Sequence, residues 1–106
     1  MPDIEISDAK RRALPRKFSF RWGSGFIVEE VSVRCSIKDN GREHSWEPTI
    51  QLLQYDDDSI DVRFCVYSNG KFTRMPPIMD EKAIKELAKR ISGTVLLKKL
   101  LSNFAK

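Results

Sequence analysis

Hydrophobic and polar side chains alternate along much of this chain, which is typical of β-strands that bury one face. The alternation runs through residues 17–22, 26–38 and 43–55, and it returns in residues 60–68 and 71–75. In the second of these segments Val31, Val33, Cys35 and Ile37 fall on one side. The pattern therefore predicts about five strands, and the inward set of the second strand belongs to the core.

Two Asn-Gly steps connect these segments, at Asn40–Gly41 and Asn69–Gly70. Asn-Gly favours the type I′ turn of a β-hairpin because both central residues need a positive φ. Counting outward from each turn gives the cross-strand pairs, and directly opposed residues point to the same side of a sheet. The expected pairs are Ile37 with His44, Cys35 with Trp46, Tyr67 with Phe72 and Cys65 with Arg74.

The second hairpin has two chemically different faces. The more apolar face would pack against a helix and comprises Val62, Phe64, Val66, Thr73 and Met75. The other face comprises Arg63, Cys65, Tyr67, Phe72 and Arg74. Leu53 and Tyr55 of the preceding strand are expected on this second side, where they would extend an exposed apolar and aromatic patch.

A helical pattern follows the strands. Pro76 and Pro77 end sheet pairing because proline has no N–H to donate to a neighbouring strand. Asp80 suits a helix N-cap, and the apolar spacing that begins at Ile84 is helical. After Gly93 the apolar face becomes broader, which favours a homodimer through the C-terminal helix. We expect an α+β fold, a twisted antiparallel sheet followed by a C-terminal amphipathic helical segment.

The chain is long enough for one domain with its own core, since it has 106 residues of which 41% are hydrophobic. We expect residues 17–106 to form this domain, with the sheet in 17–75 and the helical segment in 80–104. Residues 1–16 are expected to be a flexible basic arm. The formal net charge is +4. The basic residues of the arm and the strand entry are Lys10, Arg11, Arg12, Arg16 and Lys17.

Several classes of site are not indicated by the sequence. His44 is the single histidine, and Cys35 and Cys65 lack CxxC spacing, so we expect no metal and no cofactor. Arg63 beside Cys65 would favour its thiolate and lower the thiol pKa. Motifs of hydrolases, nucleotide-binding folds and metalloproteases are absent, so we expect no enzyme. Without a membrane-spanning run or a signal segment, a cytoplasmic protein is expected.

Arginines interleaved with aromatic rings indicate a surface for single-stranded nucleic acid, because guanidinium groups meet phosphates and rings stack on bases. The candidate binding residues are Arg21, Tyr55, Arg63, Tyr67, Lys71, Phe72 and Arg74. The basic arm would add salt-sensitive affinity, although it is equally typical of a solvated tail. An alternative is a protein–protein interaction module that uses the same aromatic face, since aromatic residues and Arg are enriched in interfaces.

The order of these elements resembles the positive-cofactor-four family of single-stranded-DNA-binding transcriptional coactivators and the related Whirly proteins. The correspondence lies within Ile60–Ile91. It rests on Asp61–Phe64, Gly70–Phe72, the two prolines, and Asp80–Glu81 opening a helix. The resemblance implies a dimer that binds single strands, DNA rather than RNA, through Arg63, Tyr67, Lys71, Phe72 and Arg74. Arg74–Ile78 replaces the family's lysine-glycine step, and the first half of this chain is longer.

Overall fold

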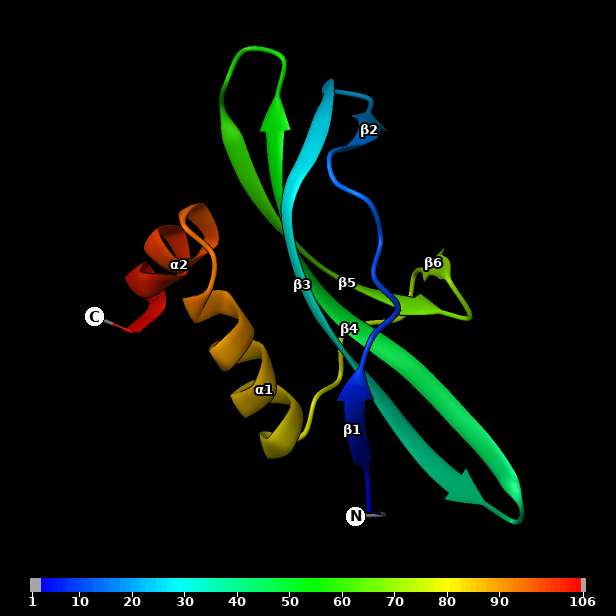
Figure 1. Cartoon of the computed structure of the whole chain (residues 1–106). Helices are drawn as coiled ribbons and strands as arrows, with labels where there is room; N and C mark the ends of the chain where they lie inside the picture. The colour runs from blue at the N-terminus through cyan, green and yellow to red at the C-terminus, as the bar shows by residue number, and fades with distance from the viewer. Residues whose placement is uncertain (1–2, 106) are drawn as a thin grey trace.

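A long two-stranded ribbon forms the centre of the computed structural model, which describes residues 3–105. Its strands are β3 (Gly23–Asp39) and β4 (Arg42–Tyr55), and both run almost the whole height of the molecule (Figure 1). The turn between them has φ values of 50° at Asn40 and 79° at Gly41. The predicted pairs Cys35 with Trp46 and Ile37 with His44 are confirmed.

The remaining strands extend this ribbon into an antiparallel sheet in the order β1-β3-β4-β5-β6, with β2 also paired to β3. β5 (Ile60–Ser68) lies beside β4, and the short β6 (Lys71–Thr73) follows through a turn with φ values of 53° at Asn69 and 78° at Gly70. The predicted pairing of Tyr67 with Phe72 is confirmed. β1 (Glu5–Asp8) and β2 (Arg16–Phe20) pair with different parts of β3.

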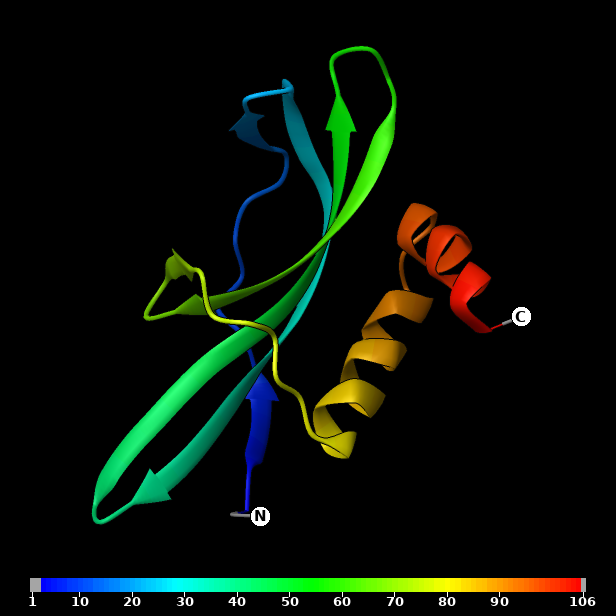
Figure 2. The same ribbon diagram turned by 180° about the vertical axis from the view of Figure 1, so that it is seen from behind.

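The helices cover one face of the sheet (Figure 2). They are α1 (Glu81–Ser92) and α2 (Leu96–Leu101), followed by the 3-10 turn η1 (Ser102–Ala105). Asp80 caps α1 by accepting a hydrogen bond from the Ala83 N–H at 2.9 Å. The carboxylate of Glu29 accepts the N–H groups of Leu96 at 3.0 Å and Leu97 at 2.8 Å, which ties α2 to β3. The α+β class and the C-terminal position of the helices are as predicted.

The main core lies between the sheet and these helices. Val31, Val33 and Cys35 of β3 point into it, as the alternation predicts. The buried members are Ile4, Val31, Val33, Cys35, Ile50, Leu52, Ala83, Leu87 and Leu97. No helix of residues 3–105 is both long and apolar enough to cross a membrane.

The N-terminal segment differs from the flexible arm expected for residues 1–16. β1 pairs with β3 from Glu5 opposite Ser36 to Asp8 opposite Val33, and Ile4 is buried in the main core with 5% of its surface exposed. Ile4 and Ile6 supply apolar side chains to the same core, and the acidic residues between and beyond them face outward. β1 has only four residues, too few for their alternation to predict a strand. The strand is recognised only because it pairs with β3.

A second, smaller core occupies the opposite face near one end of the ribbon. It contains Phe18, Ile27 and Leu53, with Phe20 and Tyr55 packed against it. Leu53 is only 2% exposed, so the expectation that it lies in an exposed patch is wrong. Leu53 does lie on the expected face, but Phe18 of β2 packs over it there. A register shift of β3 between Ile27 and Glu29, a β-bulge, turns Ile27 toward the same cluster.

Candidate nucleic-acid interface

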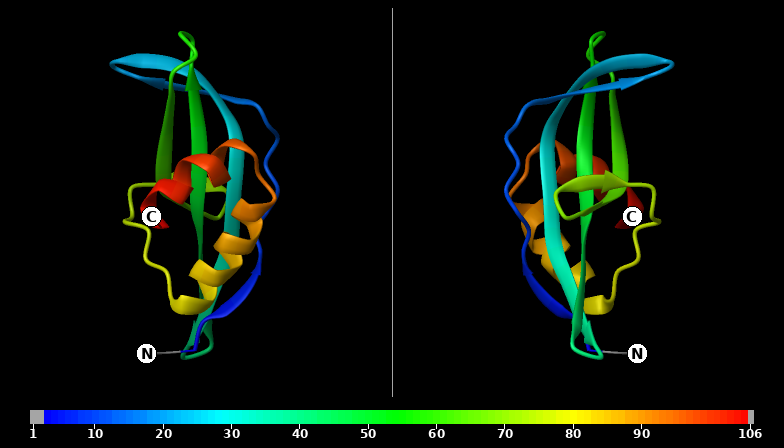
Figure 3. Two further views of the ribbon diagram at one scale, coloured as in Figure 1. Left: turned by 90° about the vertical axis from the view of Figure 1, so that its left-hand side faces the viewer. Right: turned by 90° about the vertical axis from the view of Figure 1, so that its right-hand side faces the viewer.

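Planar side chains form a continuous series across the face opposite the helices. The right view of Figure 3 looks onto this face, where β6 lies in front of the sheet, whereas the left view looks onto the helices. We call this series the ladder, and it consists, in order, of Trp22, Phe20, Arg63, Phe72, Tyr67 and Arg12.

The middle of the ladder is a guanidinium group between two rings. The Arg63 Cζ lies 4.8 Å from the centroid of Phe72 and 5.7 Å from that of Phe20. Phe20 in turn stacks on Trp22, with ring centroids 4.8 Å apart and an interplanar angle of 22°. The Arg63 Nε donates to the Gln51 Oε1 at 2.8 Å, which orients the guanidinium. Side chains of three strands, β2, β5 and β6, therefore meet at Arg63.

Two rings of the ladder are open to solvent. Trp22 is 74% exposed and Phe72 is 50% exposed. Neither Trp22 nor Phe20 was among the residues predicted from the sequence. The alternation in residues 17–22, which puts the aromatic side chains on one side, was the signal that could have identified both.

Tyr67, by contrast, is buried with 8% of its surface exposed. The Arg12 guanidinium lies over its ring at 3.9 Å, and Phe72 meets it edge-on at a centroid distance of 5.7 Å. Its hydroxyl accepts a hydrogen bond from the Gln51 Nε2 at 2.9 Å. The expectation that Tyr67 is an exposed stacking ring is therefore not met by this arrangement.

A buried polar network lies beneath the ladder, with Glu30 at its centre. The Glu30 carboxylate accepts hydrogen bonds from the Arg16 Nη2 at 2.6 Å, the Gln51 Nε2 at 2.6 Å and the Arg12 Nε at 3.3 Å. Glu47 accepts from the Arg12 Nη1 at 3.1 Å. Burial by itself raises the pKa of Glu30, but the hydrogen bonds from Arg16 and Gln51 and the two positive charges outweigh it and hold the pKa below the ordinary value.

This network changes the role expected for the basic arm. The charges of Arg12 and Arg16 are neutralised by Glu30 and Glu47, so these two residues are structural in this arrangement. Three cations of the arm stay exposed, namely Lys10, Arg11 and Lys17. Close to the ladder in sequence, the exposed cations are Arg21, Lys71 and Arg74.

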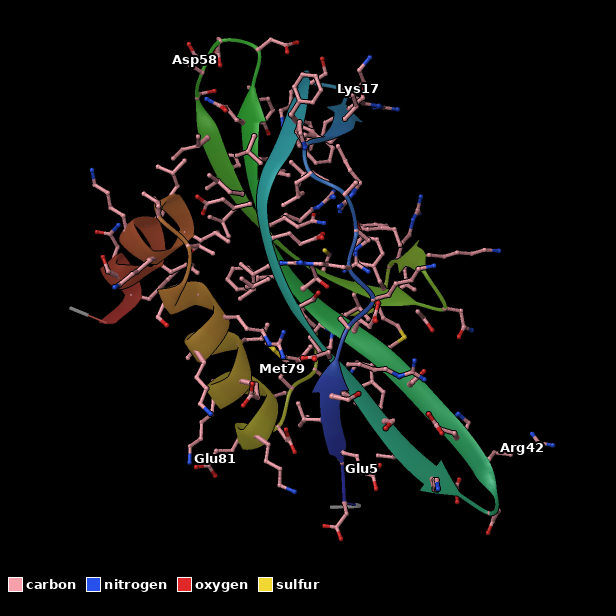
Figure 4. The ribbon with its side chains drawn as sticks, viewed as in Figure 1. Glu5, Lys17, Arg42, Asp58, Met79 and Glu81 are labelled. Atoms are coloured by element: carbon pink, nitrogen blue, oxygen red, sulfur yellow. The ribbon has the colours of Figure 1, made fainter. Side chains whose placement is uncertain are left out.

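Acidic residues surround the Trp22 end of the ladder. A shallow pocket there is lined by Trp22, Tyr55 and the acidic residues Asp56, Asp57 and Asp61. Figure 4 places Asp58 and Lys17 at this same end of the molecule. Within the pocket the Tyr55 hydroxyl accepts from the Trp22 Nε1 at 3.1 Å and donates to Asp61 at 2.6 Å, and the bond to Asp61 raises the Tyr55 pKa. Tyr55 also packs on Phe18 at 5.2 Å, so it lies outside the ladder.

The two thiols do not form a reactive site. Burial raises the pKa of Cys65 to about 11, which outweighs the opposing charge of Arg63. The lowered pKa expected from the neighbouring arginine is therefore wrong, because the strand position that pairs Cys65 with Thr49 also removes it from water. Burial likewise raises the pKa of Cys35 to about 11. Among residues 3–105, no cluster of His, Cys, Asp or Glu could hold a metal ion.

Comparison of the chain with family models, with curated proteins and with solved structures found no match in any of the three. The resemblance to the positive-cofactor-four family therefore stays a prediction.

Proposed function

We propose that the chain binds single-stranded nucleic acid along the ladder, without catalysis, as a cytoplasmic accessory factor of transcription or DNA maintenance. The observation that carries this proposal is the Arg63 guanidinium held between Phe20 and Phe72. It connects the exposed Phe72 with the stacked pair of Phe20 and Trp22 into one continuous surface of planar side chains. Every unpaired base has a face that stacks on such a surface, and each stack contributes about 1–3 kcal/mol.

The charges indicate how the strand would lie. Lys71 and Arg74 are exposed within two residues of Phe72 in the chain and would hold phosphates there, while Arg21 would do so beside Trp22. The acidic pocket beyond Trp22 repels phosphates and would end the path. A duplex is a poor fit because its bases are already stacked on one another and present no free face. The proposed preference for DNA over RNA rests on the family resemblance alone.

The acidic pocket also supports a second candidate, a protein-interaction module. An exposed Trp beside Asp56, Asp57 and Asp61 suits a basic peptide better than a phosphate backbone. Aromatic anchors of this kind are common in protein interfaces. Nucleic-acid affinity must fall steeply as salt is added, and an interface centred on an apolar Trp need not.

The first test is fluorescence anisotropy of a labelled oligo-dT strand at low and moderate salt, with a duplex and an RNA strand as comparisons. Phe72→Ala should weaken binding about 5- to 150-fold, the equivalent of about 1–3 kcal/mol. Phe104→Ala is the matched control, because Phe104 is an equally large ring, 80% exposed, in η1. Equal affinity of the Phe72 and Phe104 variants would contradict binding along the ladder.

Tryptophan fluorescence gives an independent readout of the same model. Trp46 is half-buried, and its Nε1 donates to the Ile78 carbonyl at 3.2 Å, so Trp46→Phe leaves Trp22 as the single reporter. Addition of oligo-dT to this variant should quench its emission, because Trp22 would stack on a base. Unchanged emission under conditions where anisotropy reports binding would remove Trp22 from the binding surface.

A further inference from the structure

One edge of the sheet is left open along most of β5. β6 pairs only with Val66, Tyr67 and Ser68. In the part of the chain that the structure describes, no strand pairs with the outer edge of Ile60–Cys65. An open edge presents backbone N–H and C=O groups that another strand can pair with.

The side chains of this edge are not those of a blocked strand. Ile60 is 39% exposed and Phe64 is 45% exposed, both on the helix side of the sheet. Ile60 also lines an apolar groove with Leu96 and Leu100 of α2. On the opposite face the strand carries Asp61 and Arg63, which are charges of opposite sign two residues apart.

From this pattern we infer that the β5 edge pairs with the β5 edge of a second copy of this chain, antiparallel, about a two-fold axis at Val62. A two-fold axis perpendicular to the sheet keeps each residue on its own face, so residues of equal distance from the axis oppose each other. With the axis at Val62, Asp61 opposes Arg63 of the second copy, and Ile60 opposes its Phe64. Both pairs occur twice in the dimer.

The neighbouring registers lack this complementarity. An axis at Arg63 would place the two Arg63 side chains opposite each other, and an axis at Asp61 would do the same with two carboxylates. Like charges directly opposed across strands are destabilising, whereas opposite charges and apolar pairs stabilise. Of these three registers, the one with its axis at Val62 therefore has the most favourable pairing. It also brings the groove between Ile60 and α2 beside the axis in both copies. This places the dimer interface at β5 with α2 beside it. The interface shares Arg63 with the proposed nucleic-acid surface, so the dimer is tested by mass alone, without nucleic acid.

The test measures the mass of the full chain in solution by light scattering after size exclusion, in the absence of nucleic acid. The wild-type chain should have twice the chain mass. Asp61→Arg and Arg63→Asp should each halve this mass, because each single variant sets like charges opposite each other twice. Mixing the two variants in equal amounts should restore the dimer, since the introduced arginine of one chain then faces the introduced aspartate of the other.

Two further variants make the outcome decisive. The double variant carrying both substitutions is complementary to itself again and should be dimeric, which separates loss of pairing from loss of fold. Val95→Ser is the control, because Val95 is a 77% exposed apolar residue at the N-cap of α2 that does not line the groove, and it should leave the mass unchanged. A monomeric wild-type chain, or a dimer that survives both single charge variants, would overturn the inference.

Discussion

At the scale of single residues, Arg12 joins parts of the chain that lie far apart in sequence. Its guanidinium donates to Glu30 on β3 and Glu47 on β4 and covers the ring of Tyr67 on β5. The sequence around Arg12 contains other basic residues of the same type, so no local signal distinguishes it from a solvated charge. Its role follows entirely from the strands that it contacts.

Replacing Arg12 with Ala should destabilise the fold. The side chains of Arg12, Glu30 and Glu47 are 12%, 7% and 9% exposed, and removal of one partner of a buried pair costs about 3 kcal/mol because the remaining charge is unpaired. Urea unfolding gives the change in unfolding free energy. Arg11→Ala is the matched control, since Arg11 is exposed and its loss should change stability by less than about 0.5 kcal/mol.

Glu30 should make the stability of the fold depend on pH in the acid range. Because the folded-state pKa of Glu30 is depressed, its contribution is complete above the unfolded pKa of about 4.3 and is lost as the pH falls through the lower folded pKa. Glu30→Gln should lower stability at neutral pH and flatten this acid dependence. Unfolding free energies measured from about pH 6 to about pH 3 test this, and identical slopes for both proteins would contradict it.

At the scale of elements, the bulge in β3 is what allows one strand to serve two cores. Ile27 on one side of it packs with Phe18 and Leu53, and Val31 on the other side packs under the helices. The sequence predicted one strand here, with the correct inward set from Val31 onward. It did not predict the bulge, because Ile27 and Val31 have the same phase in the sequence although they face different cores.

Gly25, close to the same bulge, should not tolerate a side chain. A Cβ at this position would clash with the Gln54 carbonyl oxygen, so Gly25→Ala forces β3 and β4 apart and should cost about 3 kcal/mol, the upper end for overpacking. Gly93→Ala is the comparison, because its Cβ would lie 3.4 Å from the nearest atom, the Arg90 carbonyl oxygen. Thermal unfolding that ranks the two variants equally would show that the strands can separate there without cost.

At the scale of the whole molecule, both faces of the sheet are covered by different parts of the chain. The helices cover one face, and the segment between β1 and β2 crosses the other and buries Tyr67 (Figure 1). Glu29 connects the bulge of β3 directly to the first N–H groups of α2. The position of the C-terminal helix therefore depends on a carboxylate in the sheet.

Removal of this connection should loosen α2 while the sheet stays folded. Glu29→Ala deletes the only acceptor that the structure shows for the N–H groups of Leu96 and Leu97, a loss comparable to that of a helix cap, about 1 kcal/mol. In this variant, amide hydrogen exchange should accelerate in Leu96–Leu101 relative to the wild-type chain, and it should change less in β3 and β4. Uniform acceleration across the chain, or none in α2, would show that Glu29 does not anchor the helix.

The sequence by itself determined the elements whose signals are local. The alternation, the two Asn-Gly turns and the Asp80 cap each depend on a few neighbouring residues, so the hairpins, the pairing of Tyr67 with Phe72 and the start of α1 follow from them. It also brought Arg63 and Phe72 to one face, because cross-strand pairing preserves the face of each residue.

Only the tertiary structure decided which of these side chains meet solvent. Leu53 and Tyr67 have the outward phase expected of them, yet Phe18 covers the first and Arg12 the second. The pKa values of Glu30 and Cys65 are set in the same way, by burial and by partners from distant segments. Such contacts join residues that no local pattern relates, and this is the physical reason why the ladder, its buried network and the open edge of β5 became visible only in the folded chain.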